Sequence, residues 1–360
     1  MQAVNSYGQE IRRALPVSST ADEQAKFLAG IPLNPESPLL ALQSNLAYLH
    51  HFQEFGKNWQ RFQKEHFLLK RKWAQAELAT FAPLAKILYY FFSGPDFITA
   101  TALFPNVDTY VFIGLEPVGK IALPETLSNE QVAYGLESLR KATETTLRYS
   151  FFITKDMRVD LNQSDFRGVL PILYAFIALP GFEILESQLI SIGAHGQVQG
   201  TSHGGVPGIH IRFRDPGYLE PKSLYYFSAD ISNAGLSGSS AGLLRWLKSL
   251  PQGYSYLKAA SYLLHENSFS TARDFLLQHT SSILQDDSGI PLQFFSSKDW
   301  NLYFYGNYTS PIELFQNRFQ PDLRAAYENN EVRPLGFGTG YNWKPGESNL
   351  LLAVRKSKIP

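Results

Sequence analysis

Four acidic residues stand in turns that follow apolar segments. Asp96 comes after one aromatic run and Glu116 after the next, while Asp286 and Asp287 form a third acidic turn. Carboxylates at the carboxyl ends of consecutive strands lie where open α/β sheets hold their ligands. They can act there as general acids and bases, or they can bind a divalent cation such as calcium or magnesium. We therefore take Asp96 and Glu116 as candidate catalytic residues.

The segment 86–120 predicts a strand, a turn, a helix, a second strand and an acidic turn. Its two strand-like runs, 86–92 and 109–115, are apolar and aromatic, as expected for strands that are covered on both faces. Ser-Gly-Pro-Asp at 93–96 closes the first run. This is the order of a Rossmann-like nucleotide-binding βαβ unit.

The segment resembles the opening of an S-adenosylmethionine methyltransferase domain, in which a glycine-rich turn ends the first strand and an acid ends the second. The resemblance implies that Gly94, Asp96 and Glu116 contact the cofactor, with Glu116 on a ribose. The turn departs from the family pattern because it has one glycine instead of G-x-G, and Pro95 lacks an amide donor. The competing interpretation makes Asp96 the N-cap of the following helix.

A metal site is a second hypothesis. His203 lies in a glycine-rich loop and His210 on the strand that follows it, with Asp230 on the neighbouring strand. A metal site needs three or four converging nitrogen or oxygen donors. The spacing of these residues matches no ligand motif, so the alternative is a polar loop with incidental histidines.

Asp286 and Asp287 are the other candidate metal ligands. The sequence places them at the end of a helix predicted over 270–285, where two negative charges oppose the helix dipole. Two aspartates that destabilise a helix end without an evident structural gain indicate a function. Here that function is the binding of a divalent cation as cofactor. The alternative is a helix terminus closed by Gly289 in the left-handed conformation.

One face of a helix predicted over 254–266 carries four reactive side chains. They are Lys258, Ser261, Tyr262 and His265. Such groups can transfer protons or attack an electrophile, so Lys258 and His265 are further candidate catalytic residues. No strained turn presents Ser261 as a hydrolase nucleophile, and the alternative is that this face packs in the core.

The composition describes a globular chain with balanced charge. Of 360 residues, 44% are hydrophobic and 18% are charged. The 32 basic residues equal the 32 acidic ones, which argues against a nucleic-acid-binding protein, because such a protein carries a basic excess. There is no cysteine, so disulfides, thiolate catalysis and iron–sulfur clusters are excluded. No stretch approaches the roughly 20 apolar residues that span a bilayer.

The residues from Gln2 onward resemble the mature start of an exported chain. They favour a soluble bacterial protein in the periplasm or outside the cell over a cytoplasmic one. The lack of cysteine fits either compartment.

Strands interleave with helices, which predicts an α/β fold with a mixed, partly parallel sheet and flanking helices. Residues 1–80 form a helical N-terminal region packed on the core, and residues 81–360 form the α/β part, with a single domain as the alternative. Helices are predicted over 55–76, 128–148, 239–250, 254–266 and 270–285. Further strands are predicted over 169–179, 182–192, 208–214, 222–231, 291–296, 300–308 and 348–356.

Three functions are compatible with these patterns. The first is an enzyme or small-molecule binder whose carboxylates gather at one sheet edge around a metal or a polyhydroxyl ligand. The second is a non-catalytic cell-envelope or protein-interaction protein, which an exposed apolar stripe on the 55–76 helix would favour. The third is a divergent S-adenosylmethionine methyltransferase-like domain, which requires that residues 93–96 are not fully packed. The residues leave open whether the chain is an enzyme.

Overall fold

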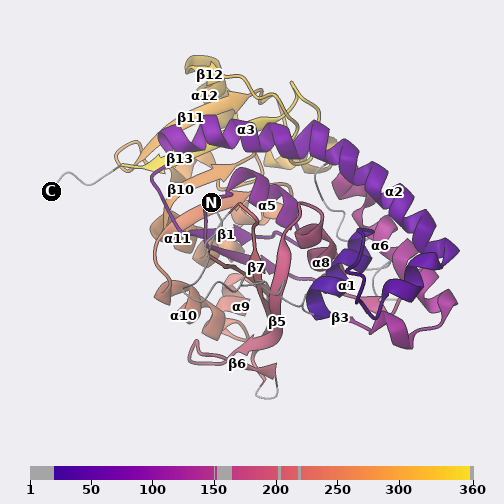
Figure 1. Ribbon diagram of the computed structural model, residues 1–360. Coiled ribbons are helices and arrows are strands. Elements are labelled where there is room, and N and C mark those ends of the chain that lie inside the picture. The colour runs from indigo at the N-terminus through magenta and orange to yellow at the C-terminus, as the bar shows by residue number, and fades with distance from the viewer. Residues whose placement is uncertain (1–19, 150, 152–163, 202–203, 218–219, 357–360) are drawn as a thin grey trace, which may run out of the picture.

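The structure is a computed structural model that describes residues 20–149, 151, 164–201, 204–217 and 220–356. Its centre is a mixed sheet of eleven strands in the order β12-β11-β13-β10-β9-β1-β2-β8-β7-β5-β6 (Figure 1). The strands are β1 (Ile87–Phe91), β2 (Thr109–Gly114), β5 (Glu183–Ile192), β6 (Val198–Gly200), β7 (Val206–Arg214), β8 (Lys222–Ser228), β9 (Gly253–Leu257), β10 (Thr280–Gln285), β11 (Trp300–Gly306), β12 (Val332–Arg333) and β13 (Asn349–Arg355). A separate small pair is β3 (Lys120–Ile121) with β4 (Phe166–Arg167). The predicted α/β class with a mixed sheet is confirmed.

Five strands form a parallel core in the order β10-β9-β1-β2-β8. The first strand of the sequence, β1, therefore lies between the second strand and a strand from much later in the chain. All five residues of β1 are buried, because apolar cores lie against both faces of the sheet. This double burial is the reason that its sequence is continuously apolar.

Antiparallel strands extend the parallel core on both sides. β7, β5 and β6 follow β8, and β13 and β11 follow β10. β5 has a bulge between Ile184 and Glu186. The Ile184 N–H group donates a hydrogen bond of 2.8 Å to Asp22, which lies on α1 (Thr20–Ala29). An ion pair joins Glu183 of β5 to Arg214 of β7.

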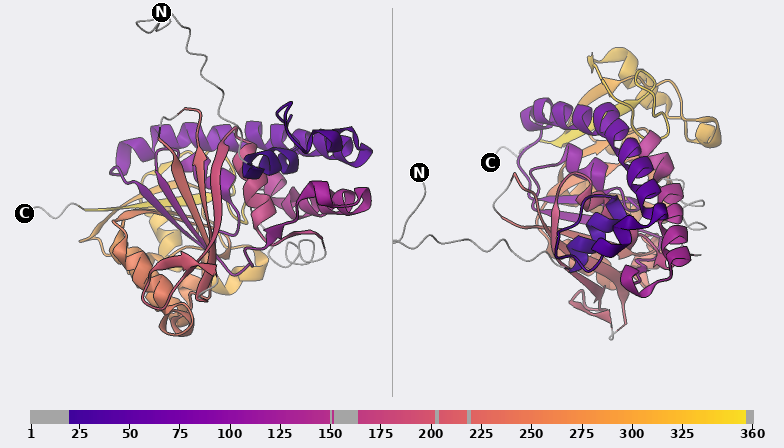
Figure 2. Two further views of the ribbon diagram at one scale, coloured as in Figure 1. Left: turned by 60° about the horizontal axis from the view of Figure 1, so that its bottom comes forward. Right: turned by 45° about the vertical axis from the view of Figure 1, so that its right-hand side comes forward.

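Helices cover both faces of the sheet (Figure 2). One face, which includes Leu88 and Tyr90, packs against α1, α2 (Leu46–Phe62), α3 (Leu68–Ala76), α4 (Leu78–Phe81), α5 (Phe97–Leu103), α6 (Asn129–Tyr149) and α8 (Leu170–Ala178). The other face, which includes Tyr89 and Phe91, packs against α9 (Asn233–Ser237), α10 (Ala241–Ser249), α11 (Ser270–His279) and α12 (Pro321–Asn329).

The predicted 55–76 helix belongs to a longer rod. α2 and α3 are joined by a π-helical turn, Gln63–Phe67, and the rod lies along one side of the sheet (Figure 2). Most of its apolar stripe is buried, with Phe55 and Phe62 at 0% exposure and Trp59 at 8%, whereas Leu69 is 40% exposed. The rod thus packs on the same core as the sheet.

One predicted strand is a buried helix. Residues 169–179 were expected to be a buried strand but contain the helix α8, all of whose residues are buried. A segment that is apolar on every side has no hydrophobic periodicity, so its sequence pattern does not distinguish a buried helix from a buried strand. Pro171, in the first turn of α8, is the helix-start signal that distinguishes them.

The remaining errors concern segments in which the chain changes conformation. The expected helix 254–266 is the strand β9 followed by the 3₁₀-helix Ala260–His265. The expected helix 270–285 is α11 followed directly by β10. The expected strand 291–296 contains a short 3₁₀-helix, Leu292–Phe294. The antiparallel pair β7–β8 and the strands β5, β11 and β13 lie where the sequence predicts them.

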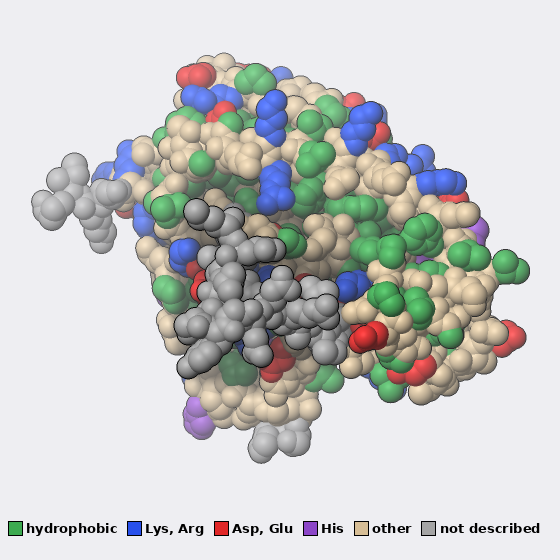
Figure 3. All heavy atoms as spheres, viewed as in Figure 1, with side chains coloured by type: hydrophobic (Ala, Val, Ile, Leu, Met, Phe, Trp, Pro, Cys, Tyr) green, Lys and Arg blue, Asp and Glu red, His purple; other side chains and the backbone are tan. Residues whose placement is uncertain are grey.

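The predicted helix 128–148 is α6, and a capping box precedes it: Ser128 N–H donates to Gln131 Oε1, and Gln131 N–H donates to Ser128 Oγ. Within the described residues no helix is long and apolar enough to cross a membrane. Basic and acidic side chains are both scattered over the face shown in Figure 3.

Candidate functional site

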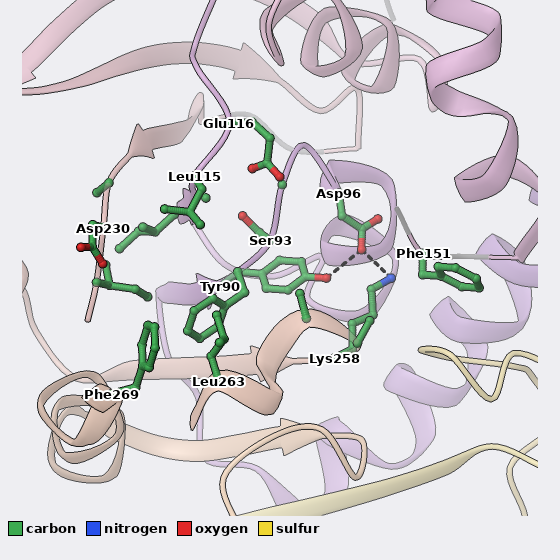
Figure 4. Close-up of a pocket in the computed structure, with 18 residues that line it drawn as sticks. Tyr90, Ser93, Asp96, Leu115, Glu116, Phe151, Asp230, Lys258, Leu263 and Phe269 are labelled. Carbon is green, nitrogen blue, oxygen red and sulfur yellow. Dashed lines mark hydrogen bonds and ion pairs between the residues drawn. The ribbon is translucent and has the colours of Figure 1, made fainter. Parts of the chain in front are cut away.

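A cavity of about 210 Å³ opens at the carboxyl ends of four neighbouring parallel strands. Its walls are the segments that follow β1, β2, β8 and β9 (Figure 4). The lining residues with polar side chains are Tyr90, Ser93, Asp96, Glu116, Asp230 and Lys258. β1 is also where the sheet order reverses direction, and such a switch point is the usual place for ligands in α/β proteins.

The turn after β1 is strained and lines the cavity. Phe92 and Gly94 both have positive φ angles, 58° and 50°, and Phe92 is one of two non-glycine residues with this conformation among the described residues. Ser93 N–H donates to Ile113 O of β2 at 3.1 Å, which fixes the turn against the neighbouring strand. Strain of this kind costs about 1–3 kcal/mol and concentrates at functional sites. Residues 93–96 are buried, but Ser93, Gly94 and Asp96 line the cavity, so the turn is not fully packed.

Asp96 stands at the N-cap position of α5 but makes no capping hydrogen bond. Its Oδ2 atom instead accepts from Tyr90 OH at 2.8 Å and lies 2.6 Å from Lys258 Nζ (Figure 4). Asp96 is 0% exposed and Lys258 4% exposed. A buried carboxylate of this kind needs such partners, because an unpaired buried charge is strongly destabilising. The alternative role of Asp96 as a simple helix cap therefore fails.

Burial and nearby charges shift the pKa values of the side chains around this ion pair. Burial raises the pKa of Tyr90 well above 10, and the negative charge of Asp96 raises it further, so Tyr90 remains a hydrogen-bond donor. Lys70 is 0% exposed; burial and then the charge of Lys258 hold its pKa well below 10.5, although Asp96 partly offsets this. Burial and then the charge of Lys70 lower the pKa of His66 to about 3.

Lys258 is held by a second strained residue. Ala259 has φ 56° and ψ −90°, and its N–H group donates to Asp286 Oδ2 at 3.1 Å. Asp286 therefore lies behind the cavity wall and fixes the turn that carries Lys258. Asp287 accepts from Tyr262 OH at 2.5 Å and from Asn349 Nδ2 at 2.9 Å.

Burial, and then the charge of Asp287, raise the pKa of Asp286 to about 7. Burial also raises the pKa of Asp287. Both residues follow a strand and not a helix, so the argument from the helix dipole was wrong. Their carboxyl groups are occupied by donors from the protein itself.

Glu116 lies two residues beyond β2 and is 6% exposed. Tyr226 OH donates to Glu116 O at 2.8 Å and approaches Glu116 Oε2 at 3.3 Å. A Cβ atom on Gly114 would stand 2.5 Å from Glu116 Oε2, so only glycine permits this position of the carboxylate. The carboxylate points toward the cavity above Ser93 (Figure 4).

Asp230 lies at the exposed end of the cavity, two residues beyond β8. Its Oδ1 atom accepts from Ser232 N–H at 2.8 Å. The structure thus brings Gly94, Asp96, Glu116 and Lys258 together with Asp230 around one cavity. Asp286 and Asp287 support its wall from behind.

The other sequence candidates do not join this cavity. His265 lies in the 3₁₀-helix after Ala259, and burial lowers its pKa to about 4. His210 of β7 stacks on Tyr225 of β8 at 4.2 Å and contacts Ser223 of the same strand. His203 lies outside the described residues. In the described part of the chain, no three His, Cys, Asp or Glu side chains converge as metal ligands.

Several lining residues were not singled out from the sequence. They are Tyr90, Ser93, Leu115, Phe151, Leu263 and Phe269. Ser93 belongs to the predicted turn 93–96 and Leu115 directly precedes Glu116, so proximity to the strand ends was a usable signal. Phe151 and Phe269 come from distant segments, and no local pattern marks them.

No family model, curated protein or solved structure matches the chain.

Proposed function

We propose that the cavity binds a nucleoside ligand without phosphate groups, of the S-adenosylmethionine class, and that the chain is a methyltransferase-like enzyme. The observation that carries this proposal is that the turn after β1 and the acid after β2 line the same cavity. A carboxylate at the second position is the usual acceptor for ribose hydroxyl groups. Bound S-adenosylmethionine would supply an electrophilic methyl group.

The strand order supports a Rossmann-like arrangement. When β5, β6 and β7 are counted as an insertion, the parallel strands follow the order 3-2-1-4-5, since β8, β2, β1, β9 and β10 are then the third, second, first, fourth and fifth. Dinucleotide-binding folds have the same order and bind at the same edge.

The charge of the lining favours a ligand without phosphates. Three carboxylates, those of Asp96, Glu116 and Asp230, face one lysine, Lys258. Phosphate groups would be repelled by this excess of negative charge, whereas a sulfonium cation would be attracted. Pro95 also removes a backbone N–H donor from the turn at which phosphates usually bind.

The other lining residues suit a nucleoside. Apolar side chains such as Ile113, Leu115 and Phe269 can cover a purine ring, while the Glu116 carboxylate can bind ribose hydroxyl groups. The interaction-protein alternative is not favoured, because most of the stripe it required on the 55–76 helix is buried; Leu69, at 40%, is its exposed large apolar side chain.

Ligand-dependent thermal unfolding tests the proposal. S-adenosylmethionine at about a hundred times its dissociation constant should add about 2.7 kcal/mol of stability, whereas NAD and ATP should add none. Glu116→Gln should weaken binding at least tenfold, because hydrogen bonds to a charged group contribute about 1.5–3 kcal/mol. Glu313→Gln, an exposed carboxylate outside the cavity, is the matched control. Stabilisation by ATP, or equal binding by the Glu116→Gln variant, would contradict the proposal.

A further inference from the structure

A second cavity, of about 370 Å³, adjoins the first. Ala260 and Leu263 line both cavities, so the 3₁₀-helix Ala260–His265 forms a wall that they share. Phe151 of the first cavity stands edge-on to Tyr341 of the second, with ring centroids 5.2 Å apart. A molecule in the second cavity would therefore lie next to a ligand in the first.

Stacked aromatic rings form much of the wall of the second cavity. Phe315 stacks on Tyr262, with ring centroids 4.5 Å apart, and on Tyr341, at 5.3 Å. Phe315 and Tyr341 are partly exposed, so a ligand can reach them, whereas Tyr262 is buried. Because the faces of these rings cover one another, the cavity meets mainly their edges. The edge of an aromatic ring attracts the electron-rich face of another ring or a negatively charged group.

The two cavities differ in the sign of their charge. The first is lined by three carboxylates and one lysine. Among the described residues that line the second, Arg318 carries a charge and the others are uncharged. Glu266 accepts a hydrogen bond from Arg318 Nη2, but a guanidinium group has five N–H donors, so others remain for a ligand. The planar fork of an arginine fits a carboxylate.

We propose that the second cavity binds the methyl acceptor, an aromatic compound with a carboxylate at one end and a hydroxyl group at the other. This inference rests on the proposed function, because it requires a methyl donor in the first cavity. Arg318 binds the carboxylate, and the aromatic ring lies against the edges of Phe315 and Tyr341. The hydroxyl end then points past Leu263 toward the first cavity.

Methyl transfer between the two cavities balances without a further reactant. The hydroxyl oxygen of the acceptor forms a bond to the methyl carbon as the bond from that carbon to sulfur breaks. The electron pair of the broken bond stays on sulfur, which becomes a neutral thioether, and the hydroxyl proton passes to water. The negative first cavity favours the cationic donor and the positive second cavity favours the anionic acceptor, so each ligand is directed to its own place.

Two naphthalene compounds separate the carboxylate from the ring. 6-Hydroxy-2-naphthoate and 2-naphthol share the bicyclic ring and a hydroxyl group, but naphthol lacks the carboxylate. Calorimetric titration of the full chain, saturated with S-adenosylhomocysteine so that no methyl group is transferred, measures their affinities. The naphthoate should bind about tenfold tighter or more, because charge-assisted hydrogen bonds from arginine to a carboxylate are strong.

Arg318→Gln should remove this difference between the two compounds. Arg324→Gln is the matched control, because Arg324 forms a similar surface ion pair, with Glu328, and lines neither cavity. Phe315→Leu should weaken the binding of both compounds roughly two- to tenfold, through loss of the aromatic contact. Phe319→Leu, at an exposed aromatic position outside both cavities, should leave both affinities unchanged.

Equal affinities of the two compounds, or a difference that persists in Arg318→Gln, would overturn the acceptor site. Titration with S-adenosylhomocysteine alone tests the proposed function separately. If this nucleoside binds but the naphthoate is not preferred, the first cavity keeps its function and the second loses its assignment; if the nucleoside does not bind, both proposals fail. With S-adenosylmethionine, mass spectrometry should detect the methyl ether of the naphthoate, and binding without this product would refute the role of acceptor.

Discussion

Asp286 combines a structural and an electrostatic role in one carboxyl group. It accepts hydrogen bonds from Ala259 and Ser288, which favour the ionised form. Burial and the neighbouring charge of Asp287 outweigh these bonds and raise the pKa to about 7. The two aspartates titrate as a coupled pair, so the proton belongs to the pair near neutral pH.

This raised pKa predicts how stability depends on pH. In the unfolded chain Asp286 ionises near pH 3.8, whereas in the folded chain it retains a proton up to about pH 7. The folded state therefore binds more protons between these values, and the stability from this group falls as the pH rises through this window. Each pKa unit corresponds to about 1.4 kcal/mol.

Chemical denaturation between pH 4 and pH 8 should show a steeper loss of stability for the wild type than for Asp286→Asn. The exposed Asp274 provides the control, Asp274→Asn, which should keep the wild-type slope. A wild-type slope in the Asp286→Asn variant would contradict this assignment.

At the scale of elements, the turn between β9 and the 3₁₀-helix Ala260–His265 is built on strain. Ala259 adopts a positive φ of 56° that glycine reaches at low cost. Relief of about 1–3 kcal/mol of strain exceeds the about 0.4–1 kcal/mol that glycine costs through the unfolded chain. Ala259→Gly should therefore stabilise the fold by about 1 kcal/mol, measured as free energy of unfolding.

Ala325→Gly tests the same change in a different setting. Ala325 is exposed in the interior of α12, so glycine should destabilise the helix by about 1 kcal/mol. Opposite signs for the two substitutions are expected. If Ala259→Gly is destabilising by a similar amount, the turn is not strained.

Some helices and strands could be predicted from local sequence signals alone. The Ser-Asn-Glu-Gln sequence at 128–131 and the apolar positions that follow at helical spacing are typical of a helix start and indicate α6, while the apolar runs with turn residues predicted β1 and β2. α11 ends at His279 and β10 begins at the next residue, Thr280. No glycine or proline marks this boundary, so no local signal in the sequence separates the helix from the strand. The carboxylates at the strand ends were predictable for the same reason as the strands.

The partners of those carboxylates were not predictable from local sequence. Lys258 reaches Asp96 only because β9 pairs with β1, and that pairing joins distant parts of the chain. The sequence placed Lys258 on a helix with His265, whereas the strand-to-turn geometry separates them. Long-range sheet order is what assembles the site.

At the scale of the molecule, the sheet has an apolar core on each face. Phe55 of α2 belongs to one core and Phe275 of α11 to the other, at 0% and 2% exposure. Because one sheet is shared by both cores, we expect a single cooperative unfolding transition. Phe55→Ala and Phe275→Ala should each cost about 3–5 kcal/mol and shift that same transition in calorimetry.

Leu46→Ala, at a position that is 82% exposed on α2, should change stability by less than about 0.5 kcal/mol. Two transitions, with Phe55→Ala moving only one of them, would instead support residues 1–80 as a separate unit.

The bulge in β5 affects whether copies of the protein can associate through the edges of their sheets. Within the described sheet, β6 covers only Ile190–Ile192 of β5, so the remaining length of β5 lies at an edge. The bulge after Ile184, the contact from Asp22 and the charge of Glu183 each interrupt a regular row of free backbone groups. Strands interrupted in this way are poor templates for adding a foreign strand. A sheet of eleven strands can therefore remain dispersed at high concentration, because its longest free edge resists aggregation.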